Sequence, residues 1–199
     1  MFLLGKHHLI FVPGLGDDNL ILHWEIKRFE NDGFIVHIHP APWRNQKENL
    51  QSKLKRLISL IDKLSNDDDL VSLVGISAGA SFVLNAYIQK KNKIAGVVNL
   101  FGRLNAGNHT PSLSFASRGN PVFKGSVLRF ERSESKLTDT DRKKVLTIRA
   151  MLDETVPLAT TPLKGAKNIQ VPLVEHTLSI FLGILIYRKL ITEFLKSCE

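Results

Sequence analysis

Short apolar runs recur along the chain, and segments with helical spacing separate them. The runs occupy residues 8–12, 34–39, 70–74, 94–100, 144–151 and 168–171. Continuous apolar runs of this length are typical of strands that are buried on both faces of a parallel sheet. Their alternation with helices predicts an α/β fold, a three-layer sandwich around a six-stranded, mostly parallel, doubly wound sheet.

The helical segments differ in how clearly they are marked. A first helix follows the first strand, with Asp17, Asp18 or Asn19 as its cap. Others are predicted over 78–90 and 178–196. The strongest pattern is a single apolar stripe, made of Leu50, Leu54, Leu57, Ile58, Ile61 and Leu64.

The alternation breaks between residues 103 and 143, where the chain is rich in serine, asparagine, glycine and charge. Only Asn120–Pro121 indicates the start of a short helix there, because proline suits the first helical position. About forty residues of weak pattern inside a compact domain usually form an insertion with a function. We therefore expect one domain over residues 1–199, with a lid-like insertion at 103–143.

Composition and charge are those of a globular protein. The 199 residues are 43% hydrophobic and 23% charged, which suits one domain and excludes a disordered chain. The net charge is +8, and nine Lys or Arg against four Asp or Glu lie between Arg118 and Arg149. Without interleaved aromatics or a nucleic-acid motif, this surplus favours a solvated basic surface. We expect no nucleic-acid partner.

A single cysteine, Cys198, limits the redox and metal chemistry. It cannot form an internal disulfide or a set of metal ligands, so a reducing cytoplasm and no metal are expected. The start of the chain, MFLLGKHHLIFVPG, lacks the small-residue cleavage site of a signal peptide. The apolar run from Leu178 to Tyr187 is about half of what a membrane crossing needs. We therefore expect no transmembrane segment.

Candidate chemistry centres on Gly75-Ile76-Ser77-Ala78-Gly79, which joins a predicted strand to a predicted helix. In a tight turn of this kind the serine takes a strained positive φ. The residues two before and two after it then meet, so only glycine fits at both places. The serine oxygen would stand at the carboxyl end of the sheet, beside a helix N-terminus. This favours a nucleophilic serine over a packing turn of small residues.

A nucleophilic serine needs a base and an orienting carboxylate, in the chain order Ser, acid, His. Asp153 follows the strand 144–151, and His176 follows the strand 168–171. The pattern therefore predicts Ser77, Asp153 and His176 as the catalytic residues. His109 is an alternative base, and Glu154 and Asp141 are competing acids.

An oxyanion hole needs two backbone N–H groups aimed at the developing charge. One is the amide after the nucleophile, that of Ala78. The other should come from the turn Pro13-Gly14-Leu15-Gly16 after the first strand. We favour the amide of Leu15, with Gly14 next.

These residues resemble the α/β-hydrolase fold over nearly the whole chain. The motifs are PGLG after the first strand, GISAG, LDETVP after the fifth strand, and EH before the last helix. The chain is similar to the smallest members, without the two strands that precede the oxyanion turn in larger ones. The resemblance implies a serine hydrolase without a cofactor. Ser77 would attack a carboxylic ester or thioester of a small-molecule acyl substrate, His176 would move the proton, and Asp153 would orient His176.

Two further motifs narrow the resemblance. His23–Trp24 and Pro40-Ala41-Pro42 are similar to small serine hydrolases related to retinoblastoma-binding hydrolases. Pro13–Gly14 departs from the His-Gly that many members carry at the oxyanion turn. The donor amides are unaffected by this difference.

Other functions remain open at this point. The same three residues suit an amidase, a peptidase or an acyltransferase. The alternative from another class is a catalytically silent module whose basic region 118–149 would bind an acidic partner. Neither the substrate nor the oligomeric state follows from the residues.

Overall fold

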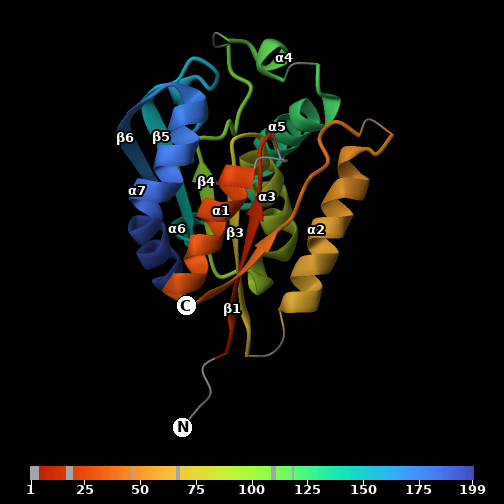
Figure 1. The fold of residues 1–199 in the computed structure, drawn as a ribbon. Coiled ribbons are helices and arrows are strands. Elements are labelled where there is room, and N and C mark those ends of the chain that lie inside the picture. The colour runs from red at the N-terminus through yellow and green to blue at the C-terminus, as the bar shows by residue number, and fades with distance from the viewer. Residues whose placement is uncertain (1–4, 17–19, 46, 66–67, 109–110, 118) are drawn as a thin grey trace.

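The fold is described from a computed structural model that covers residues 5–16, 20–45, 47–65, 68–108, 111–117 and 119–199. Its strands form one sheet in the order β2-β1-β3-β4-β5-β6, and every neighbouring pair is parallel (Figure 1). The strands are β1 (His7–Val12), β2 (Phe34–Ile38), β3 (Leu70–Ile76), β4 (Val97–Leu100), β5 (Val145–Leu152) and β6 (Lys167–Val174). The predicted doubly wound six-stranded sheet is confirmed.

Helices cover both faces of the sheet, which confirms the three-layer sandwich (Figure 1). One face carries α1 (Leu20–Lys27), the 3₁₀ helix η1 (Arg28–Asp32) and α7 (His176–Lys196). The other carries α2 (Leu50–Leu64), α3 (Ala78–Lys90) and α5 (Pro121–Ser133). The shorter elements are η2 (Lys91–Lys93), α4 (Leu113–Ala116), η3 (Glu134–Lys136), α6 (Asp139–Lys143) and η4 (Leu158–Thr160).

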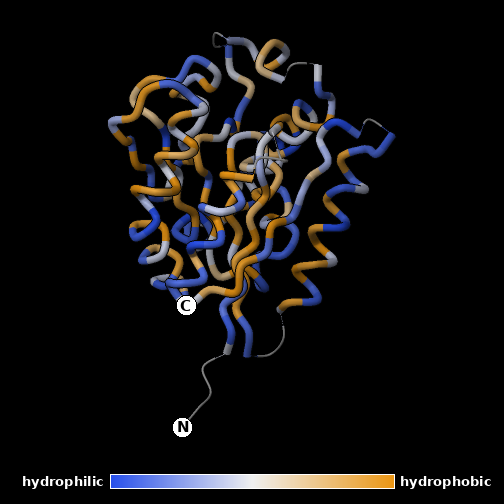
Figure 2. Tube along the Cα trace, in the orientation of Figure 1, coloured by the Kyte–Doolittle hydropathy of each residue, from blue (hydrophilic) through white to orange (hydrophobic). Residues whose placement is uncertain are grey.

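Each face of the sheet has its own apolar core, because successive strand residues point to opposite sides. In β1, Ile10 and Val12 pack toward α2, α3 and α5, whereas Leu9 and Phe11 pack toward α1 and α7. Figure 2 accordingly shows hydrophobic colour along the central strands and hydrophilic colour on the outer turns of the helices. The stripe expected on α2 faces the sheet, with Leu54, Leu57 and Ile61 fully buried.

The segment 103–143 contains more regular structure than its sequence suggested. Helix α5 begins as expected, with the Asn120 side chain accepting the N–H of Phe123 at 3.0 Å and Pro121 at the first position. It then runs for 13 residues and packs on α3, where the hydroxyls of Ser81 and Ser126 lie 2.9 Å apart. Its core contacts come from Val122, Phe123, Val127 and Phe130. Helix α5 therefore belongs to the sandwich, whereas α4 lies above the sheet edge (Figure 1).

Helix α7 begins at His176, two residues earlier than expected, because the Glu175 side chain accepts the N–H groups of Thr177 and Leu178. The caps expected at 17–19 for α1 lie outside the described residues.

A pair of substitutions on α2 tests the assignment of its buried face. Leu57→Ala should lower the free energy of unfolding by ~2–5 kcal/mol, because it opens a cavity in the core. Asp62 forms partly exposed ion pairs with Lys90 and Lys93 at 2.8 and 2.7 Å, so Asp62→Asn should cost less than ~1 kcal/mol. Urea denaturation measures both. Equal losses would contradict the orientation of α2.

Candidate active site

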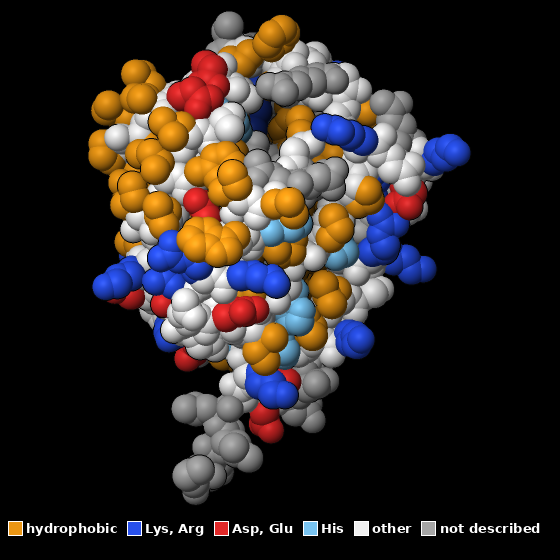
Figure 3. Space-filling model, viewed as in Figure 1, with side chains coloured by type: hydrophobic (Ala, Val, Ile, Leu, Met, Phe, Trp, Pro, Cys, Tyr) orange, Lys and Arg blue, Asp and Glu red, His pale blue; other side chains and the backbone are white. Residues whose placement is uncertain are grey.

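The sheet order changes direction between β1 and β3. From β1 the chain first adds β2 on one side, and later adds β3 on the other. Open α/β sheets bind ligands at the carboxyl ends of the strands that flank such a point. A pocket of about 250 Å³ opens there, lined in part by Gly14, Leu15, Ser77, Ala78 and His176. Figure 3 shows the surface hollowed near the top of this view.

Ser77 joins β3 to α3 in a strained conformation. Its φ is 52° and its ψ is −116°, which confirms the positive φ that the sequence predicted. The backbone is held in this turn because the Ser77 N–H donates to the carbonyl of Leu100 at 2.9 Å. Strain of this kind persists only where the surroundings fix it, and it turns the hydroxyl away from the sheet into the pocket.

Each of the two glycines around Ser77 is required by a different close contact. A Cβ on Gly75 would lie 2.5 Å from the carbonyl oxygen of Gly79, as expected for a turn folded on itself. A Cβ on Gly79 would instead lie 2.0 Å from the carbonyl oxygen of Val12. A side chain would clash at both glycines, as expected, but at Gly79 the closest contact is with the end of β1 and not with Gly75. Residue 79 is glycine because the N-terminus of α3 touches the end of β1.

A matched pair of glycine substitutions tests this contact. Gly79→Ala should lower the free energy of unfolding by ~1–3 kcal/mol or more, because the added methyl overlaps backbone that cannot move aside. Gly125 lies in α5, and a Cβ added there would have only Leu50 within 4 Å. Gly125→Ala should therefore raise the free energy of unfolding by up to ~1 kcal/mol. Thermal and urea unfolding of both variants provide the measurement. A harmless Gly79→Ala would contradict the close approach.

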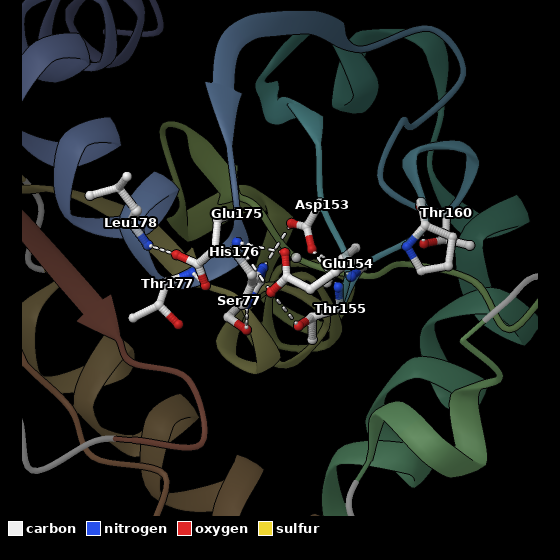
Figure 4. Close-up of polar contacts among 12 residues, drawn as sticks. Ser77, Asp153, Glu154, Thr155, Thr160, Glu175, His176, Thr177 and Leu178 are labelled. Carbon is white, nitrogen blue, oxygen red and sulfur yellow. Dashed lines mark hydrogen bonds and ion pairs between the residues drawn. The ribbon is translucent and has the colours of Figure 1, made fainter.

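Three side chains from distant parts of the chain form a hydrogen-bonded row at the pocket (Figure 4). The hydroxyl of Ser77 lies 2.9 Å from Nε2 of His176. Nδ1 of His176 lies 2.7 Å from Oδ2 of Asp153. The structure thus brings together the three residues that the sequence singled out for nucleophile, base and acid.

The direction of the protons follows from the chemistry of the groups. An ionised carboxylate only accepts hydrogen bonds, so Nδ1 of His176 donates to Asp153. In the neutral ring, Nε2 is then free to accept the Ser77 O–H. Asp153 is fixed in turn, because its Oδ1 accepts the N–H groups of Thr155 and Val156 at 2.8 and 2.7 Å. Its side chain is only 3% exposed, so these bonds replace water.

The other candidate acids have different surroundings. Glu154 does not meet the imidazole ring; its carboxylate accepts the backbone N–H of His176 at 3.1 Å. Asp141 completes the capping box of α6 by accepting the N–H of Thr138, and it pairs with Lys91 at 2.7 Å, away from the pocket residues. His109, the alternative base, lies outside the described residues.

Glu175 is a second strained residue at the site, which no sequence pattern predicted. Its φ is 72°, and its side chain accepts the N–H groups of Leu178 at 2.6 Å and Thr177 at 3.1 Å. These bonds, that from Leu178 foremost, hold the pKa of the Glu175 carboxyl below its usual value. Together with Glu154, Glu175 occupies the first three N–H groups of α7 and thereby fixes the position of His176.

The turn after β1 lies directly against Ser77. A Cβ on Gly14 would lie 3.0 Å from the Cβ of Ser77, which explains the glycine. Leu15 and Ala78 both line the pocket, and within the described ranges neither backbone N–H has an acceptor. Sequence reasoning missed Trp43, whose indole N–H donates to the carbonyl of Pro13 at 3.1 Å and anchors this turn. The one signal was the proline-rich turn that precedes Trp43.

The described part of the chain contains neither a metal-binding cluster nor a helix that could span a membrane. Within this part, no group of three or more His, Cys, Asp or Glu side chains is arranged to hold a metal ion. Among the same residues, no helix combines the length and apolarity that crossing a membrane requires.

Comparisons by sequence find no relatives, whereas comparison by structure finds many. No protein-family profile and no curated protein matches. A structure of the metagenome-derived lipolytic enzymes LipS and LipT aligns with a TM-score of 0.71 at 13% identity, over 97% of this chain and 94% of that one. Est1E from Butyrivibrio proteoclasticus aligns with a TM-score of 0.68 at 14% identity, over 98% of this chain and 89% of that one. A monoacylglycerol lipase from Paleococcus ferrophilus aligns with a TM-score of 0.65 at 18% identity, over 98% of this chain and 97% of that one.

The chain has the α/β-hydrolase fold. Coverage of nearly the full length on both sides shows that the sheet and its covering helices correspond throughout. At these identities the similarity establishes the fold and leaves the reaction to be argued from the site itself.

Proposed function

We propose that this protein is a serine hydrolase that cleaves a carboxylic ester or thioester through an acyl-enzyme. The observation that supports this most is the Ser77–His176–Asp153 row at the wall of the pocket, with both hydrogen bonds shorter than 3 Å. A strained serine between a strand and a helix has no structural purpose that an unstrained residue would not serve better. The strain is consistent with a hydroxyl held out for reaction.

In the proposed mechanism Nε2 of His176 takes the Ser77 proton while the serine oxygen attacks the substrate carbonyl. The carbonyl oxygen becomes negative and is stabilised by the N–H groups of Leu15 and Ala78, with Gly14 as the second candidate in the turn. The N-terminus of α3 adds a favourable dipole. His176 then protonates the leaving alcohol or thiol, and a water molecule releases the acyl group by the same steps in reverse order.

Most of the remaining wall of the pocket is apolar and favours an apolar acyl group. This wall includes Leu22, Phe123, Val156, Ile180 and Phe181, which offer carbon surface and no charge. Arg103 also lines the pocket, but its guanidinium donates to the carbonyls of Asn105 and Pro111, both at 2.9 Å. Structures with this fold that the comparison found include lipolytic enzymes and a monoacylglycerol lipase, which supports an ester as the substrate class. Ala116 of α4 also borders the pocket, so we propose that the segment 103–143 contributes to substrate selection.

The first test is the identity of the nucleophile. Wild-type protein should react with a fluorophosphonate probe and hydrolyse para-nitrophenyl esters, with burst kinetics when deacylation is slow. Ser77→Ala should lose probe labelling and reduce kcat by roughly a millionfold. A peptide map should place the label on Ser77. Hydrolysis that survives in folded Ser77→Ala would refute the proposal.

A matched pair of carboxylate variants tests which acid orients His176. Asp153→Asn should lower kcat by about 10⁴-fold, because an amide leaves the imidazole in the wrong tautomer. Glu154→Gln keeps an oxygen that accepts the His176 N–H, so it should cost at most about tenfold, the equivalent of one hydrogen bond. Steady-state kinetics with one ester measures both. A larger loss in Glu154→Gln than in Asp153→Asn would reverse the assignment.

A further inference from the structure

Large apolar side chains are exposed around the mouth of the pocket. They belong to three elements that also line the pocket, namely α1, α4 and α7. We call them the apolar rim: Leu20 (81% exposed), Ile21 (64%), Trp24 (62%), Phe115 (77%) and Leu178 (48%). Figure 3 shows hydrophobic side chains above, below and beside the hollow, and more of them farther along the same face.

The apolar rim adjoins the pocket wall along the chain. In each element a rim residue is the chain neighbour of a pocket residue: Ile21 of Leu22, Phe115 of Ala116, and Leu178 of Thr177. Single exposed apolar side chains are normal, but several around one opening mark a binding surface. In the described parts of the chain the rim side chains stay exposed to solvent, which points to a partner from outside.

Cationic side chains accompany the apolar rim. The Arg28 guanidinium lies 5.2 Å from the ring centroid of Trp24. The Lys124 ammonium donates to the hydroxyl of Ser114, the residue before Phe115, at 3.0 Å. Aromatic and aliphatic groups flanked by Lys or Arg suit the boundary of an anionic lipid layer, where the carbon enters and the cation meets headgroups.

Two carboxylates also lie near the mouth, those of Glu154 and Glu175. Both accept N–H groups at the start of α7. The positive end of the helix dipole offsets part of their charge. The chain as a whole carries a net charge of +8, which favours an anionic surface.

We propose that the apolar rim docks on an anionic lipid surface, from which an ester enters the pocket and reaches Ser77. The choice of a lipid surface rests on the proposed function. A protein partner or a second copy on the same residues would cover the mouth and block the substrate, whereas a lipid layer would supply it. The contact is peripheral, since the cations beside the rim stay at the headgroups.

The two tryptophans of the chain provide a direct measurement. Trp24 is 62% exposed and Trp43 is 1% exposed, so only Trp24 should report contact with lipid. Folded Ser77→Ala protein, which avoids turnover, is titrated with vesicles of three parts phosphatidylcholine to one part phosphatidylglycerol. The emission maximum should shift to the blue. Adding Trp24→Phe should remove the shift, while co-sedimentation with the vesicles persists because the ring remains apolar.

Matched variants locate the surface. Leu20→Ser with Phe115→Ser should weaken co-sedimentation by roughly tenfold, since two apolar side chains leave the interface. Arg28→Gln should weaken binding to the mixed vesicles and not to pure phosphatidylcholine. Ile35→Ser on β2 and Lys55→Gln on α2 are exposed controls away from the rim, and they should bind as the parent does.

Three outcomes would overturn the docking surface. The first is that the mixed vesicles leave the Trp24 emission maximum unshifted, and the second is that the rim and control variants bind equally. The third is that light scattering finds a dimer which the rim variants convert to a monomer. The last result would make the rim a contact between copies. Failure of docking is distinguishable from failure of the proposed function, because ester hydrolysis that requires Ser77 can persist without any binding to vesicles.

Discussion

The contact between the first turn of α3 and the end of β1 is the constraint on which the site depends. No side chain fits between them, since a Cβ on Gly79 would lie 2.0 Å from the Val12 carbonyl. This contact places the turn after β1 against Ser77, and the Trp43 indole holds that turn from the other side. Two loops from separate strands thereby face one pocket with backbone N–H groups that have no acceptor in the described parts of the chain.

Backbone strain is concentrated at the same edge of the sheet. Among the described residues other than glycine, positive φ occurs at Ser77, Phe101 and Glu175, which follow β3, β4 and β6. Each is held by a specific contact: Phe101 fills the space over Gly183, where a Cβ would lie 2.3 Å from its ring. Strain at three strand ends on one edge of the sheet is more than packing alone requires, and it is consistent with an edge shaped for chemistry at some cost in stability.

The sequence was informative wherever a local pattern determines local structure. Buried strands, the stripe on α2 and the glycines around Ser77 each follow from a few adjacent residues. It was less informative about contacts between distant segments. Helix α5 buries its face through Ser126 and Phe130 against α3, which no local pattern reveals. The roles of Trp43 and Glu154 likewise depend on partners 30 and 22 residues away.

The apolar rim shows why function is harder to infer than fold. Exposed Leu20 and Trp24 weaken the helical pattern of α1, because a sequence pattern rewards apolar positions only where they face a core. The same side chains become informative once the pocket is known to lie beside them. Large apolar side chains that stay exposed beside the candidate site are best explained by a partner outside the chain. The Arg28 guanidinium lies over the ring of Trp24, and the pocket opens nearby. An anionic lipid layer would accommodate both groups, since its hydrocarbon would bury the indole and its headgroups would pair with the guanidinium.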